Sequence, residues 1–204
     1  MKKKYSASEL KKRVIVTSEN EDNYLTRLAR EHGFKRYIIS KNITGRFSMF
    51  TPVGLFPMAV AGIDIKMLLL GAHEVLDDLT DCYRYTLYRH HMYLNNLVVE
   101  SFNIYEPKLQ DFGEWVKQLF AESHGKNGKG ILPILNINTK NLHSMGQYLQ
   151  DGLNIVFETN ILCHSKKTTK ISKYNKTLDE INTMAAYSVA LAHFNNNKNS
   201  IIME

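Results

Sequence analysis

The chain has 204 residues, of which 44% are hydrophobic and 23% charged, and its formal net charge is +6. This size and composition predict one globular domain, with room for an appendage, that buries a core without covalent staples. Two cysteines exclude a disulfide framework and favour a reducing compartment, so we expect a cytoplasmic protein.

Several classes of partner are disfavoured by the same composition. No run approaches 18 uninterrupted apolar residues, and the basic start has no apolar segment behind it, so we expect neither a membrane span nor a signal peptide. The lysines cluster at 2–4, 11–12 and 166–176 without interleaved arginine and aromatic residues, so no nucleic-acid partner is expected. The positive field suits small anions such as sugar phosphates.

The first third of the chain predicts a β-α-β unit followed by helices. A β-branched run at 13–18 and a second run at 36–42 predict strands, and a helical pattern that ends near Gly33 lies between them. This order favours a parallel sheet covered by helices. Thr51 and Pro52 predict a helix start, with an apolar helix to Ala61. Two further helices are predicted at 64–79 and 81–99.

The rest of the chain alternates strands and helices. Apolar runs predict strands at 98–105, 130–138 and 154–162. Amphipathic patterns predict helices at 107–122, at 139–152 with Thr139 as N-cap, and at 178–194. The last ten residues show no evident structural ending. The alternation again predicts a mainly parallel sheet with helices on its faces.

One candidate site combines Gln118 and Glu122 with the loop after them. The two residues are four apart, so they share a helix face near its C-terminal end. Three glycines follow within six residues, and glycine lets the backbone approach a ligand closely. A carboxylate in that setting suits a general base. A solvated glutamate before a flexible loop remains the alternative.

Two further candidates are His143 and Arg46. His143 and Gln147 share a face of the predicted 139–152 helix, and histidine titrates near neutral pH, which suits proton transfer. A histidine bonded to the backbone is the alternative. Arg46 precedes the helix start at Thr51, where the helix dipole favours an anion, so its charge suits a ligand. An ion pair with Glu19, Glu21 or Asp22 is the alternative.

The sequence lacks the motifs of several other kinds of functional site. The cysteines and histidines do not have the spacings that bring metal ligands together, so we expect no metal site. The chain also contains no Walker loop, no G-x-G-x-x-G pattern and no G-x-S-x-G nucleophile elbow.

Three stretches carry a specific resemblance. "NITGRFSMFTPVGLFPMAVAGIDI", "YEPKLQDFGEWVKQLFAESHGKNGKGILP" and "TKNLHSMGQYLQDGLNIVFET" are similar in order and spacing to bacterial-type glucose-6-phosphate isomerases. The resemblance runs from about residue 13 to 160 and fades beyond Cys163. It implies a three-layer α/β/α sandwich of the sugar-isomerase type with a mainly parallel sheet, and a division into 1–165 and a divergent extension, 166–204, with one helix.

The resemblance also implies an activity and roles for residues. The family interconverts glucose 6-phosphate and fructose 6-phosphate through a cis-enediol, with neither a metal nor an organic cofactor. Its base corresponds to Glu122, its enediolate-stabilising arginine to Arg46, and its ring-opening histidine to His143, which the partner of a homodimer supplies. Substrate contacts correspond to Gln118, Gly125 and Lys126.

Some features depart from the family. Thr44 and Ala121 stand where the family usually has glycine. Nothing in the sequence resembles the family's phosphate loop or its C-terminal catalytic lysine, and the lysines at 166–176 lack that lysine's motif. We therefore expect an internal fragment of an isomerase, weakly active or inactive alone. The alternative is a non-catalytic module that binds sugar phosphates or another protein.

Overall fold

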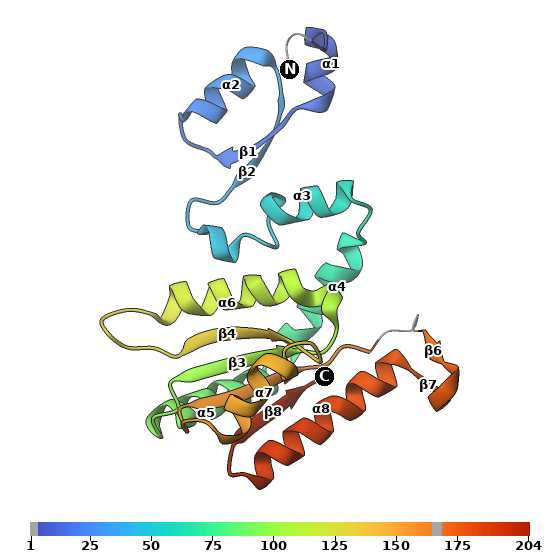
Figure 1. Ribbon diagram of the computed structural model, residues 1–204. Helices are drawn as coiled ribbons and strands as arrows, with labels where there is room; N and C mark the ends of the chain where they lie inside the picture. Colours follow the sequence, from blue (N-terminus) through green and yellow to red (C-terminus); the bar gives the residue numbers. More distant parts are fainter. Residues whose placement is uncertain (1–3, 165–168) are drawn as a thin grey trace. The chain divides into compact units, whose positions relative to one another are not determined.

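The computed structural model describes residues 4–164 and 169–204 (Figure 1). Contacts divide the chain into two compact units, Met1–Leu79 and Thr80–Glu204. The division expected between residues 165 and 166, like part of the lysine cluster at 166–176, lies outside the described residues.

Within residues 4–79, the first unit contains a two-stranded parallel sheet and four α-helices. Strands β1 and β2 pair in parallel from Ile15 opposite Lys35 to Glu19 opposite Ile39, which confirms the predicted β-α-β unit. Helix α1, which the sequence analysis missed, begins with a capping box made by Ser6 and Glu9. The elements are α1 (Ala7–Arg13), β1 (Ile15–Glu19), α2 (Tyr24–His32), β2 (Lys35–Ile39), the 3-10 helix η1 (Gly45–Phe47), α3 (Pro52–Val60) and α4 (Ile65–Asp77).

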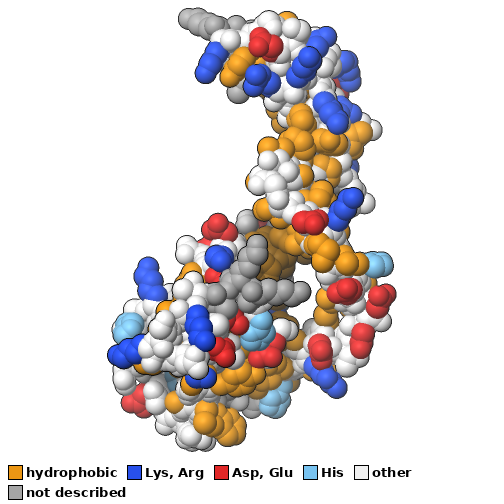
Figure 2. All heavy atoms as spheres, turned by 90° about the vertical axis from the view of Figure 1, so that its right-hand side faces the viewer, with side chains coloured by type: hydrophobic (Ala, Val, Ile, Leu, Met, Phe, Trp, Pro, Cys, Tyr) orange, Lys and Arg blue, Asp and Glu red, His pale blue; other side chains and the backbone are white. Residues whose placement is uncertain are grey.

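Local chemistry explains where the helices of this unit begin and end. Gly33 closes α2 in the left-handed region at φ 65°, as predicted, because a side chain there would be strained. Thr51 caps α3 by accepting a hydrogen bond from the backbone N–H of Val53, and Pro52 occupies the first turn. Large apolar side chains are exposed along α3 and α4 (Figure 2), among them Val53, Val60, Met67, Leu70 and Leu76.

The second unit is built on a four-stranded parallel sheet of order β4-β3-β5-β8. Its edge strand β8 was not predicted, although it forms the end of the chain beside β5 (Figure 1). The elements are α5 (Thr80–Leu94), β3 (Val99–Ile104), η2 (Pro107–Leu109), α6 (Gln110–His124), β4 (Leu132–Ile137), α7 (Leu142–Asp151), β5 (Val156–Ile161), β6 (Lys170–Ile171), η3 (Ser172–Tyr174), β7 (Lys176–Thr177), α8 (Leu178–Asn195) and β8 (Asn199–Met203).

Helices cover both faces of this sheet. On one face, Phe102 of β3 stacks on Phe120 of α6, and Tyr88 of α5 packs against Phe157 of β5. On the other face, His193 of α8 pairs with Glu158 of β5. The sheet is therefore the middle layer of an α/β/α arrangement, which confirms the predicted fold class.

Two helix starts differ from prediction. The helix expected from 107 begins as the 3-10 turn η2, and regular α6 starts at Gln110. The helix expected to be capped by Thr139 begins at Leu142, with Asn141 at the N-cap position. The Asn141 carboxamide oxygen accepts a hydrogen bond from the backbone N–H of Ile137 at 2.6 Å, so this side chain anchors the loop to β4 instead of capping α7.

Candidate functional site

Glu122 lies in the last turn of α6, where the chain leaves the helix. Gln118 donates a hydrogen bond from Nε2 to Glu122 Oε1 at 2.8 Å, so the two side chains meet as their spacing predicted. Both residues are exposed. The amide therefore orients the carboxylate and leaves it accessible to a molecule from solvent.

A tight turn follows this carboxylate. Lys126 and Lys129 exchange backbone hydrogen bonds of 3.2 and 3.0 Å around Asn127 and Gly128, both of which have positive φ. Gly130 has φ 125°, and a Cβ there would meet the His124 carbonyl oxygen at 2.6 Å. The loop is therefore a defined turn in which glycine is required, and its position keeps Gly125 and Lys126 next to the end of α6.

A cavity of about 450 Å³ opens between α5 and this turn. Ser123 and His124, which directly follow Glu122, line it together with Arg89 of α5. Desolvation lowers the pKa of His124, and the nearby positive charge of Arg89 lowers it further. The end of α6 thus combines an accessible carboxylate, a histidine biased toward its neutral form and a hollow beside them.

His143 stands at the opposite edge of the sheet. It occupies the first turn of α7, which begins where β4 ends, whereas α6 finishes before β4 begins. Strand β4 has six residues and therefore spans about 20 Å. His143 and Gln147 are both exposed. Within one chain, Glu122 and His143 therefore do not share a site.

Arg46 belongs to the first unit. It lies in η1, five residues before the Thr51 cap of α3, and its guanidinium carbon is 4.9 Å from the centre of the Phe47 ring. Two of the carboxylates considered as alternative partners of Arg46 form ion pairs with other residues: Glu21 pairs with Lys41, and Asp22 pairs with Arg27 and Arg30.

A buried ion pair between Arg89 and Glu100, with two hydroxyls around it, was missed by the sequence analysis. Glu100 of β3 is fully buried and accepts hydrogen bonds from Arg89 Nε at 2.7 Å, Tyr85 Oη at 2.5 Å and Thr159 Oγ1 at 2.8 Å. Desolvation raises the pKa of Tyr85, and the negative charge of Glu100 raises it further. These hydrogen bonds tie Tyr85 and Arg89 of α5 to the sheet. Arg89 and Glu100 would each be costly to bury without the other.

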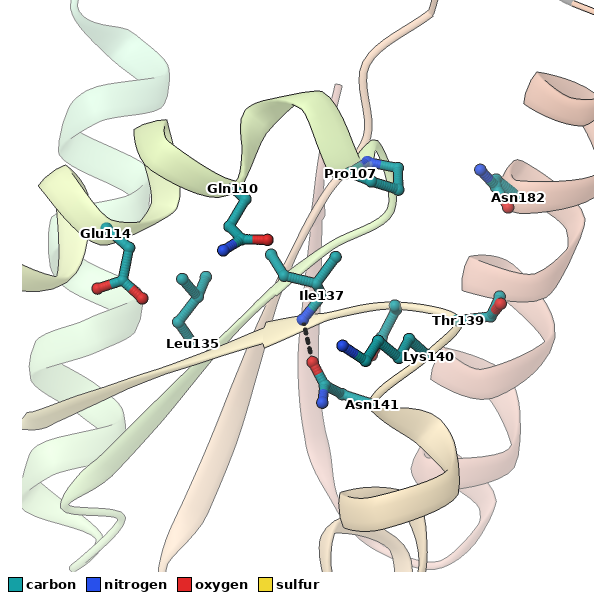
Figure 3. A pocket seen from close by; sticks show the side chains of 10 residues that line it. Pro107, Gln110, Glu114, Leu135, Ile137, Thr139, Lys140, Asn141 and Asn182 are labelled. Carbon is teal, nitrogen blue, oxygen red and sulfur yellow. Dashed lines mark hydrogen bonds between the residues drawn. The ribbon is translucent and has the colours of Figure 1, made fainter.

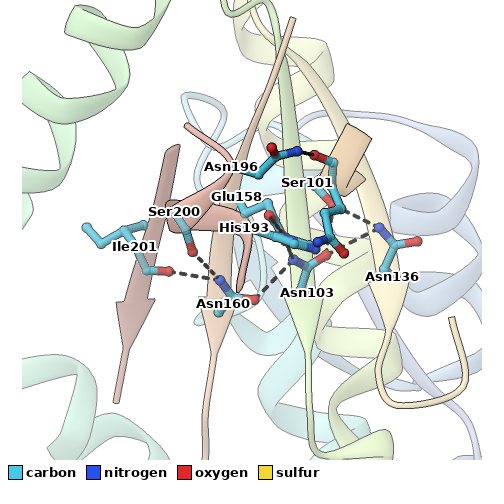
Figure 4. A network of polar contacts seen from close by, with 10 residues as sticks. Ser101, Asn103, Asn136, Glu158, Asn160, His193, Asn196, Ser200 and Ile201 are labelled. Atoms are coloured by element: carbon cyan, nitrogen blue, oxygen red, sulfur yellow. Dashed lines mark hydrogen bonds and ion pairs between the residues drawn. The ribbon is translucent and has the colours of Figure 1, made fainter. Parts of the chain in front are cut away.

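A second polar network fills the opposite face of the sheet (Figure 4). Asn103 donates hydrogen bonds to Glu158 at 2.6 Å and to Asn160 at 3.1 Å, and Glu158 pairs with His193 of α8. Ser101, Asn136 and Ser200 extend the network along the sheet. Its residues are spread over four strands and a helix, so no local sequence signal identified it.

Among residues 4–164 and 169–204, no three His, Cys, Asp or Glu side chains are grouped so that they could hold a metal ion. No helix in these same ranges is both long and apolar enough to cross a bilayer.

Curated relatives test the resemblance found in the sequence. The chain is 38% identical over 95% of its length to a glucose-6-phosphate isomerase of Heliobacterium modesticaldum, and 41% identical over 93% to that of Acetivibrio thermocellus. The predicted resemblance to glucose-6-phosphate isomerases is confirmed. The alignments cover 47% and 44% of these two relatives, so the chain spans about half the length of the isomerases it matches. No family model matches the chain.

Solved structures confirm the fold. A hypothetical protein of Thermus thermophilus superposes with a TM-score of 0.84 over 98% of the chain and 53% of its own, at 23% identity. A glucose-6-phosphate isomerase of Chlamydia trachomatis superposes with a TM-score of 0.74 over 94% of the chain and 40% of its own, at 18% identity.

Proposed function

We propose that the chain acts as part of a glucose-6-phosphate isomerase, which interconverts glucose 6-phosphate and fructose 6-phosphate through a cis-enediol in the cytoplasm. The observation that carries the proposal is the accessible Glu122 carboxylate, oriented by Gln118 at the end of α6. That pair lies in a sequence whose relatives are named glucose-6-phosphate isomerase. The chemistry proceeds with neither a metal nor an organic cofactor.

Each candidate residue receives a role in this reaction. Glu122 moves the proton between C2 and C1 of the sugar. Arg46 stabilises the enediolate, because a developing oxyanion needs a fixed positive group. His143 opens the sugar ring by proton transfer. Gln118, Gly125 and Lys126 contact the substrate at the end of α6.

His143 acts, on this proposal, in the site of a second copy. The support is topological, because the amino and carboxyl edges of β4 separate Glu122 from His143 by about 20 Å within one chain. No proton transfer to one sugar spans that distance. A homodimer in which each copy supplies a histidine to the other resolves the separation.

Activity is tested in a chimera, because the chain spans about half of its relatives and is expected to be weak or inactive alone. The matching segment of the Acetivibrio thermocellus isomerase is replaced by this chain, and conversion of fructose 6-phosphate is followed by a coupled assay. We expect Glu122→Gln to lower kcat by at least about a hundredfold. Asp111→Asn, an exposed carboxylate on the same helix, is the matched control and leaves kcat within about twofold.

Mixing two inactive chimeras tests the exchange of His143. Glu122→Gln and His143→Asn subunits, dissociated and reassociated together, form hybrid dimers that contain one intact site. We expect about a quarter of the unmutated activity to return. If the mixture stays inactive although hybrid dimers form, the histidine does not cross between copies. A folded unmutated chimera without turnover supports the non-catalytic sugar-phosphate module instead.

A further inference from the structure

The cavity of about 450 Å³ between α5 and the turn after α6 is within the size range of small-molecule sites. We call it the α5 cavity. The side chains that matter to its chemistry are Arg89, His90, Tyr93, His124, Lys129 and Ile131. They come from α5, from the last residue of α6 and from the segment that leads to β4, so the cavity exists only where these elements meet.

The α5 cavity lies on the side of α6 that is turned away from Glu122. His124 packs against the Phe120 ring, with 5.3 Å between the ring centres, and Phe120 stacks on Phe102 of the sheet. Gln118 and Glu122 are exposed and bond to each other. Each residue of an α-helix advances by about 100°, so Glu122 and His124 are about 200° apart around α6. A ligand in the α5 cavity is therefore kept away from the Gln118–Glu122 pair.

The lining of the α5 cavity carries basic side chains and no carboxylate among the described residues. The basic groups belong to Arg89, His90, His124 and Lys129. Glu100, which pairs with Arg89, is fully buried in β3 and lies outside the lining. Desolvation lowers the pKa of His124, and the charge of Arg89 lowers it further, against a weaker opposing effect of Glu100. An anion in the cavity would offset the repulsion between the two basic groups.

Arg89 has hydrogen-bonding capacity that the protein leaves unused. The residue is 7% exposed, and its Nε donates to Glu100 at 2.7 Å. Its Nη2 has no hydrogen-bond partner among the described residues. An unpaired buried donor costs about 1–3 kcal/mol. A carboxylate that accepts from this guanidinium would recover part of that cost, since charge-assisted hydrogen bonds are stronger than neutral ones.

We propose that the α5 cavity binds a small organic acid with two or three carboxylates. One carboxylate accepts hydrogen bonds from Arg89 and His124, and a second pairs with Lys129. The Tyr93 ring contacts the carbon chain between them. Because the basic groups come from separate elements, a di- or tricarboxylate meets more of them than one compact anion such as inorganic phosphate. The site goes beyond the proposed isomerase reaction and does not depend on it.

The test is binding of citrate, a tricarboxylate, to the unmodified chain at constant ionic strength, followed by the amide and imidazole signals of an isotope-labelled sample. We expect shifts at residues 86–93 and 123–131. The pKa of His124 is expected to rise on binding, because a carboxylate beside the ring favours the imidazolium. Succinate binds more weakly than citrate, and acetate and inorganic phosphate bind more weakly still.

Variants of single lysines locate the site. Lys129→Gln is expected to weaken citrate binding about fivefold, as loss of one exposed charge pair would give. Lys129→Arg keeps the charge and restores the affinity. Lys140→Gln removes the same charge at the opposite edge of the sheet, so it is the matched control and leaves the affinity unchanged.

The outcomes separate this inference from the proposed isomerase. Citrate binding persists in Glu122→Gln, and glucose 6-phosphate does not displace citrate, whether or not the chimera turns over. Shifts confined to other residues, or equal effects of Lys129→Gln and Lys140→Gln, overturn the inference. An affinity for inorganic phosphate as high as that for citrate overturns it as well, since only a general positive field would then attract anions. Displacement of citrate by glucose 6-phosphate would make the cavity part of the isomerase site and would likewise overturn the inference.

Discussion

At the scale of single residues, the pair of Arg89 and Glu100 makes the clearest stability prediction. Arg89→Met keeps most of the side-chain volume but leaves the Glu100 carboxylate buried without its cation. We expect a loss of about 3–5 kcal/mol in the free energy of unfolding, measured by urea denaturation. Arg84→Met on the same helix removes the exposed pair with Asp81 and changes stability by less than about 1 kcal/mol.

The double variant Arg89→Met with Glu100→Met separates charge from packing. No buried charge is then left unpaired, but the Tyr85 and Thr159 hydroxyls lose their acceptor, so only part of the lost stability returns. A double variant as unstable as Arg89→Met alone would show that these two hydrogen bonds, together with packing of the guanidinium over the Phe120 ring, 4.1 Å from its centre, outweigh the ion pair.

Tyr105 gives a prediction for alkaline pH. Burial raises the pKa of Tyr105 from 10.0 to about 12, against the opposing effect of the Asn138 side chain. The folded chain therefore holds this proton more tightly than the unfolded chain. The resulting stability is complete below about pH 10 and is lost as the pH rises to about 12.

The Tyr105→Phe variant should not show this loss of stability at alkaline pH. Its free energy of unfolding is expected to fall less between about pH 10 and about pH 12 than that of the unmodified chain. At neutral pH the variant loses only the contact of this hydroxyl with the Asn138 side chain, so its free energy of unfolding is expected to stay within about 1 kcal/mol of that of the unmodified chain. Parallel stability curves for the two proteins over the alkaline range would contradict the assignment.

At the scale of elements, the contact of α6 with the sheet depends on Gly113. A Cβ at this position would meet the ends of the Ile104 and Leu135 side chains, each at 2.6 Å, and Ile104 is fully buried. Alanine favours a helix by about 1 kcal/mol over glycine, but overpacking costs about 1–3 kcal/mol. We therefore expect Gly113→Ala to be neutral or destabilising in urea denaturation.

Gly146 on α7 is the matched control. A Cβ there finds its nearest atom 3.9 Å away, at Leu142, so alanine adds helix propensity without a clash. Gly146→Ala is expected to raise the free energy of unfolding by about 0.5–1 kcal/mol. If both alanine variants stabilise the protein equally, α6 does not pack as closely on the sheet as described.

The elements also show how far sequence reasoning reaches. The β-α-β order, the Thr51 cap and the end of α2 at Gly33 follow from local sequence rules. The structure agrees with the prediction at all three. Strand β8 was missed because it is short and follows a polar, asparagine-rich segment, so only pairing with β5 reveals it. The polar side chains of β3 carry no local sign of their burial in the sequence, yet Glu100 is buried against α5 and Asn103 on the face that α8 covers.

Some features of the candidate site can likewise be predicted from the sequence, and others cannot. The contact of Gln118 with Glu122 depends on helical spacing, so the sequence predicts it correctly. The separation of Glu122 from His143 depends on which edge of the sheet each loop occupies, and spacing along the chain does not carry that information. A cavity that Gln110 of α6, Asn182 of α8 and the β4–α7 loop line together (Figure 3) likewise emerges only from the assembled topology.

At the scale of the whole molecule, the exposed apolar side chains of α4 predict self-association. Met67 is 62% and Leu70 48% exposed, and Leu69, Val75 and Leu76 are exposed on the same helix. Exposed apolar side chains gathered on one helix favour association of proteins. We expect the mass of the unmodified chain in sedimentation velocity to rise with concentration, and the double variant Met67→Gln with Leu70→Gln to weaken that rise.

Stability distinguishes this effect from unfolding. Glutamine suits a helix and both positions are exposed, so the double variant should keep its free energy of unfolding within about 0.5 kcal/mol. Glu74→Gln, an exposed polar change on α4, is the control and leaves the association as it was. If the double variant associates as strongly as the unmodified chain, α4 is not the surface of contact. The interface that brings His143 of one copy to the site of another must then use a different surface.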